Sequence, residues 1–155
     1  MKKEINPNKL SSYYERVKTI AKNSHDAETK VGAILIHPVS GAQIADGYNG
    51  FIRGALDSSL PNKRPEKYEY IKHAEENLIS NAARHGIATD GCIVFCSLSP
   101  CIRCIRLLYQ CGINIIYFKE KYSDFEHCSN MKDMEIHVEE INGFYKLSTF
   151  PKKEF

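Results

Sequence analysis

Residues 73–104 read HAEENLISNAARHGIATDGCIVFCSLSPCIRC, and this stretch predicts a helix, a buried strand and the start of a second helix. Apolar side chains recur at helical spacing after His73, and Gly86 provides a C-terminal stop for that helix. The run GCIVFCSL at 91–98 is almost entirely apolar, which is typical of a buried strand. A helix, a strand and a helix in succession indicate an α/β fold.

The remaining elements predict a mixed sheet with helices on both faces. Ser99 and Pro100 form a helix start, because the hydroxyl can cap free backbone N–H groups and proline suits the first turn. Residues 50–70 are polar and rich in Gly and Pro, so they predict a long loop, and loops of this length are usually functional. The other expected elements are a first helix from about Pro7 to Lys22, a hairpin at 31–37 and 41–48, a helix from Cys101 to Cys111, a fourth strand at 113–118, a last helix near Asn130 to Ile141 and a fifth strand at 144–150.

Composition and charge narrow the class of protein. The 155 residues, 43% of them hydrophobic, fit a single domain, residues 1–155, with one core. The net charge of +2 and the dispersed basic residues do not indicate a surface for long nucleic acids, whereas a small anionic ligand fits them well. No apolar run approaches membrane-spanning length and no signal peptide is evident, so we expect a cytoplasmic protein without membrane partners. In that reducing compartment, the six cysteines are expected to be metal ligands or packed thiols.

Four residues in the opening stretch have the chemistry of a zinc site. His73 offers an imidazole, and Cys101 and Cys104 offer thiolates, all of which zinc binds readily. The two cysteines share a face of the first helical turn, where the helix dipole favours the thiolate. Glu75 lies about 200° from His73 around a helix, so both can approach one ion only off the helix N-terminus. We therefore expect two helix N-termini, near His73 and Cys101, to converge on one zinc ion.

Three protein ligands leave a fourth position open, as in catalytic zinc sites. Two thiolates cancel much of the ion's charge, so a water at that position needs a nearby base, and Glu75 is placed to be it. The alternative is a closed structural site completed by Cys92 or Cys96, although the sequence has no second close ligand pair. Otherwise these two cysteines, like Cys111 and Cys128, are expected to be packed thiols.

The motifs H-x-E at 73–75 and P-C-x-x-C at 100–104 resemble those of the zinc-dependent nucleoside and nucleotide deaminases. Within that superfamily, the chain resembles the deoxycytidylate deaminases from about Tyr13 to Asp124. Free-cytidine deaminases usually present Cys-Ala-Glu in place of His-Ala-Glu, and transfer-RNA adenosine deaminases lack the long loop. The stretches that carry the resemblance are KNSHDAETKVGAILI at 22–36, DGYNG at 46–50, LPNKRPEKYEYIKHAEEN at 60–77 and SLSPCIRC at 97–104.

The resemblance implies the cytidine deaminase-like fold, a three-layer α/β/α sandwich with a five-stranded mixed sheet. It implies deamination of deoxycytidine monophosphate (dCMP) to deoxyuridine monophosphate (dUMP) and ammonia, with one zinc ion held by His73, Cys101 and Cys104. Glu75 would take a proton from water and deliver protons to the ring nitrogen and the departing ammonia. The alternatives are deamination of another cytosine nucleoside or nucleotide, or of adenosine in RNA, and nucleotide binding without catalysis.

Substrate contacts also follow from the resemblance. Asn49 matches the family asparagine beside the sugar, and the neighbouring glycines Gly47 and Gly50 would let the backbone approach the ligand. A plain turn at the end of a strand explains these three residues equally well. The other implied contacts are Lys30 and Arg53 for the phosphate, together with Ala74 and Ser99.

Metal content and partners complete the expectations. Some family members hold a second, structural zinc, but residues 49–72 contain neither Cys nor His, so we expect only the catalytic ion. The resemblance implies a homo-oligomer, a hexamer in many members, and regulation by deoxycytidine and thymidine triphosphates (dCTP and dTTP). Arg84 and His85 could join an effector site, or could simply place favourable charge at a helix C-terminus.

Overall fold

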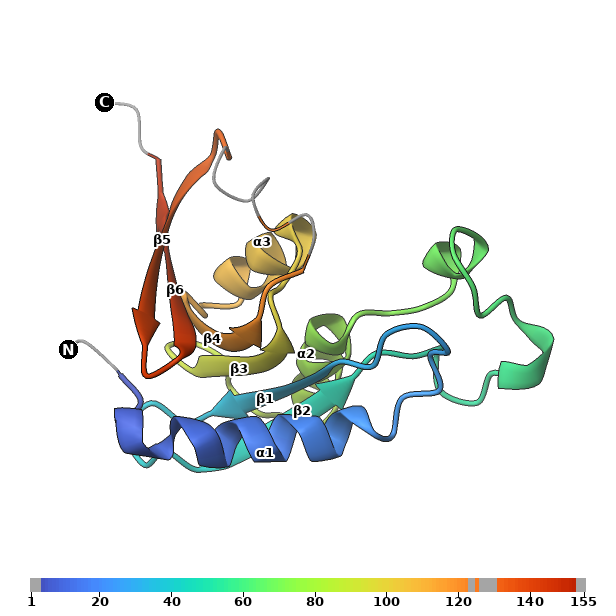
Figure 1. Ribbon diagram of the computed structural model, residues 1–155, viewed down its shortest axis with the longest axis horizontal. Coiled ribbons are helices and arrows are strands. Elements are labelled where there is room, and N and C mark those ends of the chain that lie inside the picture. Colours follow the sequence, from blue (N-terminus) through green and yellow to red (C-terminus); the bar gives the residue numbers. More distant parts are fainter. Residues whose placement is uncertain (1–3, 123–124, 126–130, 153–155) are drawn as a thin grey trace.

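The computed structural model describes residues 4–122, 125 and 131–152 and contains a six-stranded mixed sheet (Figure 1). The strand order is β2-β1-β3-β4-β6-β5. Strands β3 and β4 are parallel, and every other neighbouring pair is antiparallel. The elements are α1 (Leu10–Ala21), β1 (Gly32–Ile36), β2 (Gln43–Tyr48), α2 (Ala74–Arg84), β3 (Ile93–Leu98), α3 (Ile102–Gln110), β4 (Ile115–Glu120), β5 (Met134–Ile141) and β6 (Phe144–Pro151), with short 3-10 helices η1 (Pro7–Lys9), η2 (Asp57–Ser59) and η3 (Glu66–Glu69).

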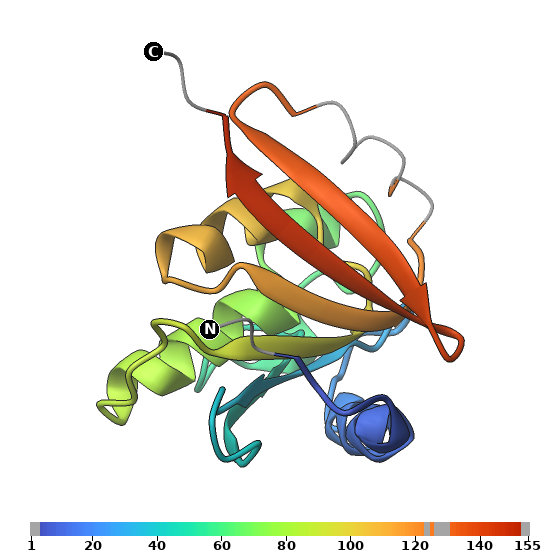
Figure 2. The ribbon, with the colours of Figure 1, turned by 90° about the vertical axis from the view of Figure 1, so that its left-hand side faces the viewer.

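Helices cover both faces of the central strands, which confirms the expected α/β arrangement. In Figure 2, α1 is seen end-on against one face, while α2 and α3 lie against the other. Side chains alternate along β1 accordingly: Ile34 packs in the cluster of α1, whereas Leu35 packs in the cluster of α2 and α3. Burial on both faces explains why β1 and β3 are continuous apolar runs in the sequence.

The expected last helix near Asn130 to Ile141 is wrong, so the sheet has six strands where five were expected. Residues 134–141 form β5, which pairs with β6 in antiparallel register. The two strands are joined at Asn142 and Gly143, whose φ angles of 52° and 81° are left-handed, as an Asn-Gly hairpin turn requires. The alternation of apolar and polar residues in MEIHVEEI, followed by Asn-Gly, was the available signal. Asn130 and Cys128 lie outside the described residues.

Two glycines set how closely helices approach the sheet. A Cβ on Gly47 would lie 2.4 Å from the backbone nitrogen of Leu78, so this residue lets β2 and α2 pack closely. Gly47 therefore faces α2. From the sequence, this glycine was instead expected to bring the backbone to a ligand. Gly32 plays the same part for α1, because its Cβ would lie 2.2 Å from the carbonyl oxygen of Val17.

The long loop at 50–70 extends away from the β5–β6 hairpin, as Figure 1 shows in green and red. Its two ends meet, because Gly50 and Lys72 exchange backbone hydrogen bonds of 3.0 and 2.8 Å. The return of the loop at Lys72 places the next residue, His73, at the start of α2. Within the described residues, no helix has the length and apolar character needed to cross a bilayer.

Candidate active site

The start of α2 and the start of α3 bring three donor atoms together. His73 and Cys101 are the N-cap residues of the two helices, and Cys104 follows in the first turn of α3. The Nδ1 atom of His73 lies 3.5 Å from the Cys101 sulfur and 3.4 Å from the Cys104 sulfur. A hydrogen bond of 3.0 Å from the His73 backbone N–H to the carboxylate of Glu76 closes the first turn of α2 and fixes this cap.

This donor set fits a zinc ion. The donor atoms of His73, Cys101 and Cys104 all lie within 4.8 Å of one another, which allows a single ion to contact all three. Among the described residues no other Cys, His, Asp or Glu joins the group, so neither Cys92 nor Cys96 closes it as a fourth ligand. On the described residues, three donors would leave one position of a tetrahedral zinc ion open, as in catalytic zinc sites.

The charge on the two sulfurs is unequal when no metal is bound. A hydrogen bond from the Cys104 thiol, with a further one from His73, lowers the pKa of Cys101 to about 4. The same contact raises the pKa of Cys104, whose thiol keeps the shared proton. The hydrogen bond to Cys101 also raises the pKa of His73. The lowered pKa favours the thiolate form of Cys101, which is the form that binds a metal ion.

Glu75 lies in the first turn of α2 and lines the same pocket as His73 and Cys101. The residue is only 4% exposed, and this burial raises the pKa of its carboxyl. Hydrogen bonds from its own backbone N–H and from the Cys96 thiol oppose the shift in part. A carboxyl whose pKa is raised holds a proton more readily, which suits a group that must both accept and return one.

The pocket has a volume of about 290 Å³, and two of the three donor residues, His73 and Cys101, line it. Asn49, Ala74 and Ser99, expected near the substrate, all line it. The expected phosphate contacts do not. The remaining lining residues are Asp26, Thr29, Val31, Arg64, Lys67, Tyr68, Ile71, His73, Glu75, Leu98, Cys101 and Tyr122.

Lys30 and Arg53 lie outside this pocket. Lys30 lines a neighbouring hollow that shares only Thr29 and Leu98 with it. The Arg53 guanidinium is held by a hydrogen bond to the side chain of Asn81 on α2. Both residues were expected to contact the phosphate because they are cationic, and charge alone does not show which cations line the pocket.

Ser99 has a different role from the expected helix cap. The N-cap of α3 is Cys101, two residues later. The Ser99 hydroxyl instead accepts a hydrogen bond of 2.7 Å from the backbone N–H of Tyr122 and so ties the segment after β4 to the pocket wall. Tyr122 thereby becomes a lining residue that the sequence did not indicate.

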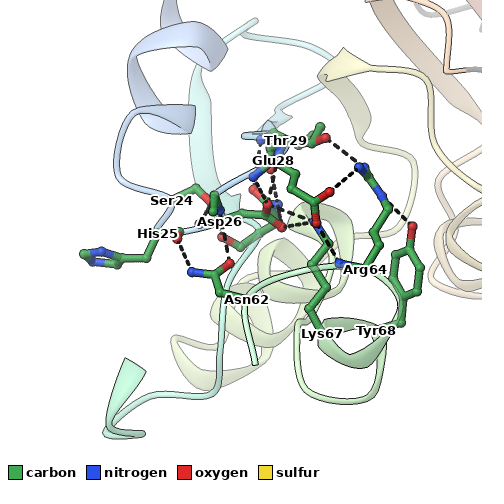
Figure 3. A network of polar contacts seen from close by, with 12 residues as sticks. Ser24, His25, Asp26, Glu28, Thr29, Asn62, Arg64, Lys67 and Tyr68 are labelled. Atoms are coloured by element: carbon green, nitrogen blue, oxygen red, sulfur yellow. Dashed lines mark hydrogen bonds and ion pairs between the residues drawn. The ribbon is translucent and has the colours of Figure 1, made fainter. Parts of the chain in front are cut away.

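A cluster of charged side chains in the pocket wall and beside it was also missed. Figure 3 shows Lys67 and Arg64, from the loop at 50–70, facing Asp26 and Glu28, which lie between α1 and β1. The Arg64 guanidinium donates to Glu28 at 3.0 Å and contacts the hydroxyl of Tyr68 at 2.6 Å. Two cations and two carboxylates balance one another here, so the wall carries no net formal charge. All four residues lie in the stretches 22–36 and 60–77 that carry the family resemblance, but residue type and spacing there do not separate them from ordinary surface charges.

Comparisons with known proteins agree with this site. The sequence profile described as "Cytidine and deoxycytidylate deaminase zinc-binding region" matches residues 7–120. Deoxycytidylate deaminases of Mus musculus and Homo sapiens are 35% and 34% identical over 113 and 116 residues, covering 68% and 70% of this chain. The matched regions are 62% and 64% of those proteins, so the chain spans just under two thirds of their length. The dCMP deaminase of cyanophage S-TIM5, solved in complex with dCMP and dUMP, is 26% identical with a TM-score of 0.66, covering 81% of this chain and 92% of that one.

Proposed function

The chain belongs to the family of cytidine and deoxycytidylate deaminases, and on that premise we propose that it hydrolyses dCMP to dUMP and ammonia. The observation that carries the proposal is that a buried carboxyl, Glu75, lines one pocket together with His73 and Cys101, two of the three residues of the donor set. A volume of about 290 Å³ is near the lower end of the usual range for small-molecule sites, about 300–1,000 Å³, and suits a compact nucleotide.

The family binds zinc, and the residues that would hold it here are His73, Cys101 and Cys104. Bound zinc supplies Lewis acidity, which makes water a stronger nucleophile at neutral pH. The convergence of two helix N-termini on the site would stabilise the two thiolates and reduce the cost of keeping negative charge in a half-buried position.

Glu75 performs the proton transfers. Its carboxylate takes a proton from the attacking water while the water oxygen adds to the ring carbon that bears the amine. The carboxyl gives that proton to the ring nitrogen, takes a second proton from the hydroxyl now on the ring carbon and passes it to the amine. The carbon–nitrogen bond then breaks, which releases ammonia and leaves the carbonyl oxygen on the ring. Burial of Glu75 supports this cycle, since a carboxyl in an apolar site holds a proton more readily than one in water.

Asn49 and the first residue of α2 orient the nucleotide. The backbone N–H of Ala74 has no acceptor inside the helix, so it can donate to the base. The side-chain oxygen of Asn49 accepts one hydrogen bond, from Val31, and keeps a lone pair with which to accept one from a sugar hydroxyl. Of the two cations that line the pocket, Arg64 is the more exposed and is the candidate to meet the phosphate.

Ammonia release measured with dCMP, deoxycytidine, cytidine and RNA adenosine tests the proposal. We expect kcat/KM to be highest for dCMP. If deoxycytidine is turned over as fast as dCMP, the proposed phosphate contact is wrong. If only another base is deaminated, the proposed substrate is wrong. Binding of dCMP without ammonia release from any substrate would favour the non-catalytic alternative.

The wider setting is also proposed from the family. The chain acts as a single domain in the cytoplasm and assembles as a homo-oligomer, a hexamer, which responds to dCTP and dTTP. Analytical ultracentrifugation with and without each triphosphate tests both points. A monomer that ignores both nucleotides would contradict them while leaving the deamination chemistry intact.

A further inference from the structure

A buried ion pair lies in the pocket wall, apart from the zinc ligands and the proton-transfer residue. The ammonium of Lys67 is 2.9 Å from each carboxylate oxygen of Asp26, and these side chains are 3% and 2% exposed. Resting on the proposed function, we infer that this pair is a positioning device which fixes the side-chain amide of Asn49 in the orientation that the substrate requires. Neither charged group needs to touch the reacting atoms for this role.

The contacts of Asn49 define one orientation of its amide. The side-chain oxygen accepts from the backbone N–H of Val31 at 2.9 Å. The side-chain nitrogen donates to the carbonyl of Thr29 at 2.8 Å and lies 3.4 Å from a carboxylate oxygen of Asp26. Turning the amide over would set its oxygen against two acceptors and its nitrogen against a donor. The one orientation leaves a lone pair on the oxygen for a hydroxyl donor in the pocket.

Asp26 can enforce this orientation only while it is ionised, because a protonated carboxyl could donate as well as accept. Burial by itself would raise the pKa of Asp26. Hydrogen bonds from the backbone N–H groups of Thr29 and Glu28, together with Lys67, outweigh that effect and lower the pKa. Lys67 thus helps to keep its partner an acceptor only, and the burial of both groups holds them in place.

The same pair attaches the long loop to the pocket wall. Lys67 lies on η3 within that loop, and Figure 3 shows its side chain reaching across to the segment that carries Asp26. The contact is reinforced at Asn62, whose side chain donates to the carbonyl of His25 at 2.8 Å. Because Arg64 belongs to the same loop, the ion pair positions both the proposed sugar contact and the proposed phosphate contact.

A double variant, Asp26→Asn with Lys67→Met, removes both charges of the pair. Glu28, which also lies 3.3 Å from the Lys67 ammonium, keeps its ion pair with Arg64, so no charge is left buried alone. The matched control is Lys146→Met on β6, because Lys146 is also buried, 2% exposed, and paired at 2.7 Å with Glu4, yet does not line the pocket. Each purified protein is measured for zinc content, for kcat and KM with dCMP, and for hydrogen exchange of the Val31 amide by NMR.

We expect the double variant to retain zinc, to raise KM about tenfold or more and to change kcat by less than about threefold, since it loosens binding but not proton transfer. The Val31 amide, freed from a fixed acceptor, should exchange about tenfold faster or more. The Lys146→Met variant should leave KM and Val31 exchange at wild-type values. If the double variant does not fold, Lys67→Arg, which keeps the charge in a different shape, should show the same two changes at about threefold.

Three results would overturn the inference. One is wild-type Val31 exchange in the double variant, and another is equal acceleration in the Lys146→Met control, which would indicate general loosening. The third is faster Val31 exchange with an unchanged KM, which would separate Asn49 from the substrate. Failure of the wild-type protein to deaminate dCMP would instead refute the proposed function, and Val31 exchange would still decide whether the pair holds the amide.

Discussion

The two walls of the pocket are built in opposite ways. The wall that holds His73, Cys101 and Cys104 comes from two short motifs, each at the start of a helix. The second wall, which includes Asp26 and Lys67, joins residues 41 positions apart in the chain, and no short motif indicates its chemistry. Both walls are held by electrostatics, but only the first uses residue types that are rare enough to be recognised.

The comparison shows that residues for reaction chemistry are easier to predict from a sequence than residues that position a substrate. Thiolate and imidazole ligands at fixed spacing have few other uses in a reducing compartment. Lysine and aspartate are common on every protein surface, and their meaning changes only when burial removes water from around them. Loss of one ligand from the first wall should therefore abolish activity, whereas substitutions in the second wall should reduce substrate binding in graded steps.

The largest expected effect is on the first wall. Replacing the buried ligand in Cys104→Ser should lower zinc content below about 0.1 ion per chain and abolish turnover, because a hydroxyl is a poor substitute for a thiolate. Metal analysis, ammonia release and the thermal midpoint measure this. Cys111→Ser, at the other end of α3, is the control and should keep zinc. Full zinc content in Cys104→Ser would show that this sulfur is not a ligand.

Glu75→Ala should keep zinc and bind dCMP but lower kcat by about 10⁴-fold, the upper end of what one general acid–base contributes. Single-turnover ammonia release and calorimetric binding of dCMP separate the two effects. Glu140→Ala, an exposed carboxylate on β5, is the control and should behave as the wild type. A fall of less than tenfold in the Glu75 variant would assign the proton transfers to another group.

The effect of changes in the second wall on the free energy of unfolding should depend on whether one charge of the ion pair is removed or both. Lys67→Met alone leaves Asp26 buried and unpaired, so we expect the free energy of unfolding to fall by about 3–5 kcal/mol. The double variant with Asp26→Asn should lie within about 2 kcal/mol of the wild type, because neither charge is then stranded. Urea unfolding of all four proteins in the cycle measures this. Additive losses would mean that the two groups do not interact.

Low pH should abolish the contribution of the Asp26–Lys67 ion pair to the free energy of unfolding. The pKa of Asp26 is lowered from its ordinary value of 3.8, so the folded state favours the ionised form. The stability that this provides is present above pH 3.8 and is lost as the pH falls through the lower pKa of the folded state. The difference in unfolding free energy between wild type and the double variant should therefore shrink below that pH. A constant difference would indicate that Asp26 does not titrate in this way.

The smallest effects are expected outside both walls. Arg53→Ala and Lys30→Ala should each change KM for dCMP by less than about twofold, because neither side chain lines the pocket.

Arg64→Ala is the comparison variant within the pocket and should raise KM about tenfold or more if that residue meets the phosphate. Steady-state kinetics on the three variants decides between them. A larger effect at Lys30 would place the phosphate in the neighbouring hollow.

The misassigned hairpin also separates what local sequence indicates from what contacts between distant segments decide. β5 alternates apolar and polar residues over Met134–Ile141, but its apolar residues also fall at spacings that a helix allows, and pairing with β6 decided the outcome. The Asn-Gly turn was a local signal that was overlooked. Gly47 is a different case, since only the position of α2 explains why that strand residue must lack a side chain.

The amino-acid sequence by itself determined the α/β class and the family, and it indicated the three residues of the possible metal site and the proposed acid–base carboxyl, because each depends on residue type at short spacing. Tertiary structure alone decided which cations line the pocket, how the amide of Asn49 is turned and that the sheet has a sixth strand. The physical reason is that coordination chemistry is local along the chain, whereas burial depends on which distant segments exclude water from a given side chain.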